Sequence, residues 1–144
     1  MTLPAPLEEI AAFLETLSED ERRDALVAHA EGAGAWEPRQ GERFEREDIR
    51  HDQRECTDQV GIHLRLEEGG TCAFRISLGP RVQTLTRALS AILAQGLEGA
   101  GAQQVLAVPG TLIPRLVGAE LVRLRARSVY YILRRMQEIV REAA

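Results

Sequence analysis

Apolar and polar residues alternate along two neighbouring stretches near the middle of the chain. Apolar residues occupy every second position from 60 to 66 and again from 72 to 78. A period of two is typical of a strand with one buried face, and the two glutamates and two glycines at 67–70 predict a turn. Matching the apolar faces predicts a hairpin over 59–78 that pairs Leu66 with Cys72, Leu64 with Phe74, Ile62 with Ile76 and Val60 with Leu78.

Helical spacing of apolar residues marks the segments on both sides of this hairpin. Ser18 and Glu21 have the spacing of a capping box, which predicts that a helix starts directly after residue 18. The last segment carries an apolar stripe, and its other face is rich in arginine. The predicted helices are 7–17, 19–30, 81–97, 112–117 and 123–143, with an apolar hinge over 105–109.

The segment 33–58 follows neither period. It is polar and dense in charges of both signs, so it predicts an exposed loop with a short edge strand near 44–49. A loop of this length inside a compact domain is often functional. Helices around a hairpin therefore predict one α+β domain over 1–144, with a functional loop before the first long strand.

Composition limits the classes of protein to consider. The chain has 144 residues and a net charge of −4, which argues against a nucleic-acid binder. All 18 basic residues are arginine, so Schiff-base chemistry on lysine is excluded. We find no apolar stretch long enough to span a membrane and no secretion signal in residues 1–10, and we therefore expect a cytoplasmic protein.

The predicted register separates the two cysteines, Cys56 and Cys72. Cys72 is paired with Leu66, ten residues after Cys56, so the two lie roughly 30 Å apart if the strand stays extended. Bridged cysteines need Cα atoms within about 7 Å. We expect no disulfide and no shared metal site, and we interpret Cys72 as a core residue because it shares a face with Phe74 and Ile76.

Cys56 has a different setting, at the end of the charged loop just before the strand. His51 and Arg54 favour its thiolate, whereas the acidic neighbours on either side oppose it. His51 is five residues away in a loop, which fixes no geometry for a thiol–imidazole pair. The neighbouring residues alone leave open whether Cys56 is reactive or an incidental surface thiol.

The residues from Glu55 to Val60, with Cys56 second, resemble the cysteine motif of SufE-type sulfur acceptor proteins. No single motif is specific, but their order and spacing together are, and the resemblance covers about residues 7–143. It continues through Gly79-Pro80, Thr86, Ile92-Leu93, Gly96-Leu97, Gly99, the run 105–109 and the run 124–127 that opens the last helix.

The resemblance implies helices packed on one face of a small antiparallel sheet, as in the SufE and IscU folds. It implies that Cys56 takes sulfur from the persulfide of a cysteine desulfurase and delivers it to an iron–sulfur scaffold complex, without a cofactor or metal. The family's C-terminal arginine falls on Arg125, and we add His51, Arg54 and Gln59 as supporting residues. The chain departs from the family at Gly61, where many relatives carry an aromatic residue, and at Asp58, which often matches a serine. We expect a monomer or a weak homodimer.

Other functions remain open at this point. The chain is alternatively a pure interaction module that docks a partner, with Cys56 incidental. An iron–sulfur scaffold needs three cysteines and the chain has two. A thiol hydrolase needs an ordered base and an oxyanion hole that the sequence does not provide. We expect His63 to be solvated, because it falls on the polar face of its strand.

Overall fold

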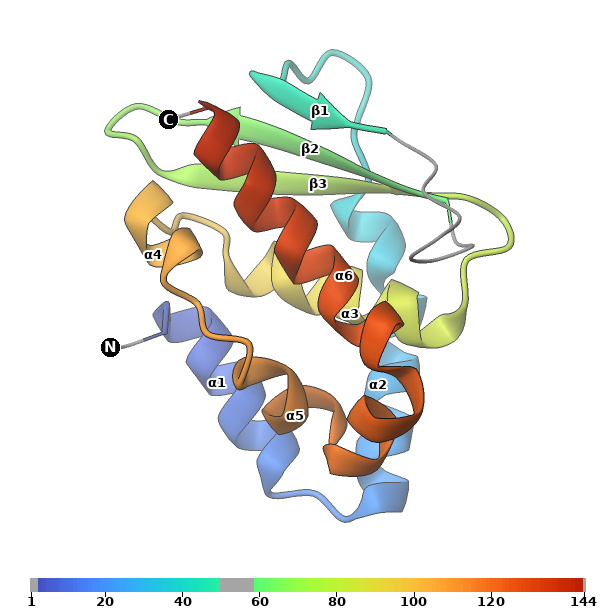
Figure 1. The fold of residues 1–144 in the computed structure, drawn as a ribbon. Helices are drawn as coiled ribbons and strands as arrows, with labels where there is room; N and C mark the ends of the chain where they lie inside the picture. The colour runs from blue at the N-terminus through green and yellow to red at the C-terminus, as the bar shows by residue number, and fades with distance from the viewer. Residues whose placement is uncertain (1–2, 50–58, 144) are drawn as a thin grey trace.

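The computed structural model of the chain describes residues 3–49 and 59–143. It has three layers (Figure 1): a small sheet, then α3 and α6 packed against it, then α1, α2 and α5. This is the α+β class that the sequence predicts. The elements in chain order are α1 (Ala5–Glu15), α2 (Glu19–Glu31), η1 (Ala33–Trp36), β1 (Arg46–Asp48), β2 (Val60–Leu66), β3 (Cys72–Leu78), α3 (Thr84–Gly96), α4 (Ala102–Leu106), α5 (Leu112–Val117) and α6 (Ala119–Ala143).

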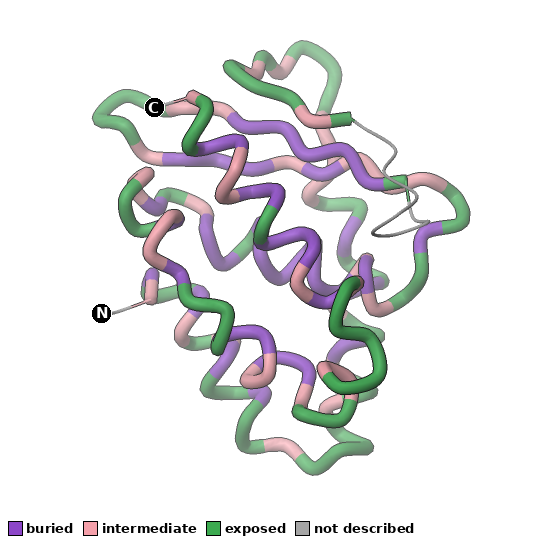
Figure 2. The backbone as a smooth tube through the Cα atoms, viewed as in Figure 1, coloured by how far each residue is buried: buried purple, intermediate pink, exposed green. Residues whose placement is uncertain are grey.

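The sheet has the order β1-β2-β3, with both neighbouring pairs antiparallel. All four predicted pairs of the hairpin are confirmed, from Val60 with Leu78 to Leu66 with Cys72. The short edge strand expected near 44–49 is β1, in which Asp48 is paired with Ile62. The apolar residues of β2 and β3 on the face that α3 and α6 cover are buried, except Leu66 and Leu78, which are partly buried; Figure 2 shows this burial along the tube.

The predicted helix bounds are correct to within a few residues in most cases. The capping box at the start of α2 is present, since Glu21 N–H donates to the Ser18 hydroxyl at 3.2 Å and Ser18 N–H to the Glu21 carboxylate at 2.9 Å. The last helix starts at Ala119 instead of 123, and it is kinked at Arg125. The expected hinge at 105–109 was wrong in part, because α4 occupies its first two residues.

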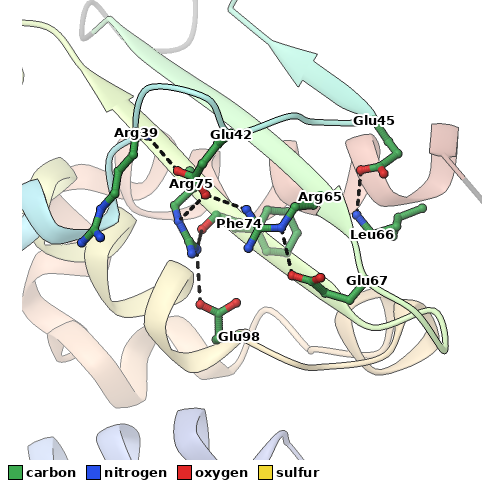
Figure 3. A network of polar contacts seen from close by, with 9 residues as sticks. All are labelled: Arg39, Glu42, Glu45, Arg65, Leu66, Glu67, Phe74, Arg75 and Glu98. Atoms are coloured by element: carbon green, nitrogen blue, oxygen red, sulfur yellow. Dashed lines mark hydrogen bonds and ion pairs between the residues drawn. The ribbon is translucent and has the colours of Figure 1, made fainter.

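The segment 37–45 is exposed over much of its length, as its composition predicts, but it is also bonded to the hairpin. It crosses the polar face of the hairpin, and Figure 3 shows how Glu42 fastens it there. The Glu42 carboxylate accepts from Arg65 Nη1 at 2.5 Å and from the backbone N–H of Arg39 at 2.7 Å, and it lies 3.6 Å from Arg75 Nε. Charges that look solvated in the sequence are therefore paired across the sheet.

Helix α3 lies between the sheet and the outer helices, and nine of its 13 residues are buried. Its last residue, Gly96, permits close contact with α1: a Cβ at this position would lie 2.6 Å from Leu7 Cδ1 and 3.0 Å from Leu7 Cα. Leu7 itself is fully buried. The lack of a side chain at Gly96 thus sets the distance between the two helices. Among the described residues, no helix has both the length and the apolar character needed to cross a membrane.

We expect Gly96→Ala to destabilise the fold, because the added methyl group overlaps the backbone and side chain of Leu7. Overpacking of this kind costs about 1–3 kcal/mol in the free energy of unfolding, measurable by urea denaturation. Gly34→Ala is the matched control, since no atom lies within 4 Å of a Cβ built there. Equal stability of the two variants would contradict this account of the α1–α3 contact.

Candidate functional site

Three of the predicted site residues, His51, Arg54 and Cys56, lie outside the described residues. The other cysteine, Cys72, is fully buried, as predicted. Burial raises the pKa of the Cys72 thiol, which disfavours the thiolate that reacts as a nucleophile. Cys72 belongs to β3 and is paired with Leu66. Leu66 lies at the far end of β2 from Gln59, roughly 20 Å along the strand. Cys72 is therefore a structural residue, remote from Gln59.

The structure describes a group of residues at one end of the sheet, which we call the frame: Asp48, Gln59, Gln83, Arg125 and Arg135. Asp48 ends β1 and Gln59 precedes β2, so both flank the segment 50–58. The antiparallel register brings them to the same end of the sheet, because Asp48 pairs with Ile62, two residues into β2. In Figure 1 the turn after β3 and the kinked part of α6 lie at this same end.

Two of the predicted residues, Gln59 and Arg125, are joined to the turn between β3 and α3. The Gln59 carbonyl accepts from Gly79 N–H at 2.9 Å. Four residues further along the turn, the Gln83 side-chain oxygen accepts from Arg125 Nη1 at 2.9 Å. Arg87 fastens the turn from α3, since its Nη2 donates to the Gly79 carbonyl at 2.8 Å. Residues far apart in the sequence thus meet on one short connection.

A buried guanidinium ties α6 to the edge strand. Arg135 is only 1% exposed, and its Nε donates to Asp48 Oδ2 at 3.0 Å while its Nη2 donates to the Asp48 carbonyl at 2.8 Å. The guanidinium also lies 5.1 Å above the ring of Tyr131, a cation–π contact. Its Nη1 has no hydrogen-bond partner among the described residues. Since an unpaired buried charge is costly, the Asp48 contact holds the end of β1 against α6.

His63 corrects a prediction: it is buried, not solvated. Its Nδ1 lies 2.5 Å from a Glu47 carboxylate oxygen, and its Nε2 is hydrogen-bonded to the Ser77 hydroxyl. A serine, a histidine and a glutamate in this order have the connectivity of a hydrolytic triad. However, the ring of Phe44 lies 5.2 Å from that of His63. Ser77 is paired within the strand ladder opposite Gly61. We therefore assign the group a structural role, linking the three strands on their polar face.

The same group explains why a glycine stands at position 61. A Cβ there would lie 3.3 Å from the Ser77 side chain and 3.4 Å from His63 Nε2. An aromatic side chain at this position would displace this hydrogen bond. Gly61 is therefore coupled to His63 and Ser77.

Sequence reasoning missed Asp48, Arg87 and Arg135. Arg135 follows Ile132 by three residues and precedes Ile139 by four, so it falls on the apolar stripe of α6. A charged residue on an apolar stripe indicates a buried ion pair, so this signal could have identified Arg135. Asp48 carries no comparable pattern, since it stands among other charged residues. Arg87 lies between Thr86 and Ala88 in a largely apolar helix, and its partners are backbone carbonyls, which leave no trace in the sequence.

No group of three or more His, Cys, Asp or Glu side chains that could hold a metal ion occurs in residues 3–49 and 59–143. Comparison with models of known protein families and with curated proteins finds no match. Among solved structures, the chain is similar to the solution structure of a hypothetical protein from Thermus thermophilus, with a TM-score of 0.75 and 26% sequence identity. The similarity covers 99% of this chain and 98% of the other. It supports the fold over its whole length and carries no statement of function.

We expect Asp48→Ala to cost about 3–5 kcal/mol in the free energy of unfolding, because it leaves the buried guanidinium of Arg135 without its carboxylate. Replacing both residues, as in Asp48→Ala with Arg135→Met, should recover much of this loss. Arg123→Met serves as the control, since its pair with Glu120 is exposed and 3.9 Å long. A loss for Asp48→Ala no larger than for Arg123→Met, by urea denaturation, would refute the role of the buried pair.

The Glu42 cluster predicts a dependence of stability on pH. The backbone N–H of Arg39 and then the guanidinium groups of Arg65 and Arg75 hold the pKa of Glu42 below its ordinary value of 4.5. A lowered carboxyl pKa stabilises the fold above the ordinary value, and the contribution disappears as pH falls through the folded-state pKa.

Glu42→Gln should therefore destabilise the protein at neutral pH and have a smaller effect near about pH 3. Urea denaturation at both pH values measures the difference. Glu68→Gln, at an exposed residue of the hairpin turn, is the control. A Glu42→Gln effect of the same size at both pH values would show that the charge of Glu42 is not what stabilises the fold.

Proposed function

We propose that this chain is a sulfur acceptor of the SufE type, in which Cys56 accepts sulfur from a cysteine desulfurase and delivers it for iron–sulfur cluster assembly. The proposal begins from the motif around Cys56 and the order of further motifs along the chain. The fold class that this resemblance implies agrees with the observed α+β architecture. No cofactor is required for the reaction proposed.

The observation that carries the proposal is the meeting of Gln59 and Arg125 at one short connection. Gln59 belongs to the cysteine motif and Arg125 to the motif that opens the last helix, and 66 positions separate them in the sequence. Hydrogen bonds join one to Gly79 and the other to Gln83. Two distant stretches that carry the resemblance are thus bonded to the same short turn, which supports one site at this end of the sheet.

The chemistry needs one thiol and no net oxidation. The Cys56 thiolate attacks the outer sulfur of the desulfurase persulfide, a new S–S bond forms, and the desulfurase cysteine leaves as a thiolate. The product is a persulfide on Cys56, which can pass its outer sulfur to an acceptor by the same exchange. Cys72 does not compete, because it is buried and its pKa is raised.

The second candidate function is an interaction module in which Cys56 is incidental. It is favoured by the groove of apolar and arginine side chains described in the next subsection. The two functions differ in whether they need the thiol of Cys56. A sulfur carrier needs that thiol, whereas a docking module needs only its binding surface.

We expect intact-protein mass spectrometry to show a gain of one sulfur atom after incubation with a cysteine desulfurase and cysteine. Cys56→Ser should abolish the gain, because it removes the accepting thiol. Cys72→Ala is the matched control and should retain it, since Cys72 is buried away from the frame. If the wild-type protein gains no sulfur from a desulfurase that binds it, the carrier function is refuted and the interaction module remains.

A further inference from the structure

A groove runs between α2 and the first turns of α6. It consists of two adjoining cavities of about 350 and 470 Å³, which share Arg23, Leu26 and Leu121 as lining residues. Volumes of this size are typical of clefts that bind ligands. In Figure 1 the kinked start of α6 lies beside α2, and Figure 2 shows that this stretch of α6 is exposed.

The groove is flanked by apolar side chains that are largely exposed. Leu124 is 64% exposed and Val27 is 40% exposed, and they are two of the four large hydrophobic residues described as exposed. Each lines one of the two cavities. Single exposed apolar residues are ordinary, but apolar residues gathered along one groove indicate an interaction surface.

The charge of the lining is opposite to that of the chain. The protein carries a net charge of −4, yet the only charged residues described as lining the larger cavity are Arg23 and Arg125. Arg125 makes no ion pair among the described residues, and Arg23 has an exposed contact of 3.5 Å with Asp20. The smaller cavity adds Arg22 but also two glutamates. The positive part of the groove is therefore the end next to α3.

The start of α3 adds to this positive character. Thr84 and Leu85 line the larger cavity, and the N-cap residue Gln83 makes no capping bond. The Gln83 side-chain oxygen is instead bonded to Arg125. Free backbone N–H groups at a helix start carry partial positive charge, which adds to that of the two arginines.

We propose that this groove binds an amphipathic helix of a partner protein, with an apolar stripe against Leu26, Leu121 and Leu124 and acidic residues against Arg23 and Arg125. A groove between two helices accepts a helix through residues spaced i, i+3, i+4 and i+7. The acidic residues are required near α3, where the lining is positive. This inference goes beyond the proposed function and does not rest on the chemistry of Cys56.

Two synthetic helical peptides of about 18 residues provide the test. Both carry a leucine stripe, flanked in one by glutamates and in the other by lysines. Fluorescence anisotropy should show binding of the glutamate peptide with a Kd on the order of 10–100 µM, weakened by added salt. The lysine peptide should bind at least about 10-fold more weakly.

Variants at exposed positions locate the binding. Arg23→Glu and Leu124→Asp should each weaken binding of the glutamate peptide by at least about 10-fold. Phe13→Asp and Arg141→Glu are matched controls on other surfaces, and they should leave binding unchanged. Circular dichroism checks that all four variants are folded.

Three outcomes would overturn the proposal: no binding of the glutamate peptide, equal binding of both peptides, or equal effects of groove and control variants. Sedimentation equilibrium adds a fourth. If the wild-type protein dimerises and Leu124→Asp abolishes the dimer, the groove is covered by a second copy and not by a partner's helix.

Discussion

A buried ion pair between Arg135 of the last helix and Asp48 of the edge strand holds these two elements together. Arg135 binds both the carboxylate and the backbone carbonyl of Asp48, and it is almost wholly removed from solvent. A buried pair of this kind adds little stability compared with apolar packing. What it adds here is position: β1 has only three residues, and Arg135 fixes where it ends relative to α6. The end of β1 and the start of β2 delimit the segment that contains Cys56.

The remaining parts of the frame follow from the same arrangement. With β2 paired to β3 in a fixed register, Gln59 lies beside Gly79, and the turn after β3 leads to Gln83. The kink of α6 at Arg125 directs the first turns of that helix toward this turn and α2. One helix therefore serves two surfaces, with Arg135 against the sheet and Leu124 along the groove. The same register buries Cys72 at the opposite end of the hairpin from Gln59.

Those parts of the fold that depend on local pattern were predictable from the sequence. The hairpin register followed from alternation alone, because a shift by one residue would have exposed Ile62 and Phe74. The capping box of Ser18 and Glu21 was predictable because its contacts lie within four residues. The burial of His63 was not predictable, since it depends on Phe44 and Glu47. These two residues belong to a segment that shows neither helical nor strand periodicity. Helix α4 escaped prediction because it is only five residues long and follows a glycine-rich stretch.

The site was predictable to a smaller degree. Arg125 and Gln59 were named from a resemblance, and their convergence on the turn at 79–83 depends on tertiary structure. The pairing of Arg135 with Asp48 spans 87 positions, beyond the reach of any local rule. The groove between α2 and α6 likewise requires two distant segments to meet. The sequence identifies one candidate thiol, Cys56. The structure adds the contacts of Asp48 and Gln59, which flank the segment 50–58 in the sequence.

The central claim is that Cys56 is the residue of this chain that carries the transferred persulfide sulfur. The most direct measurement is tandem mass spectrometry of tryptic peptides, prepared after persulfide alkylation of protein incubated with a desulfurase and cysteine. Cleavage after arginine separates the two cysteines into peptides 55–65 and 66–75. The account predicts an additional sulfur on the first peptide and none on the second. An additional sulfur on the peptide that contains Cys72 would contradict it. So would the absence of an additional sulfur from both peptides while the desulfurase carries its persulfide.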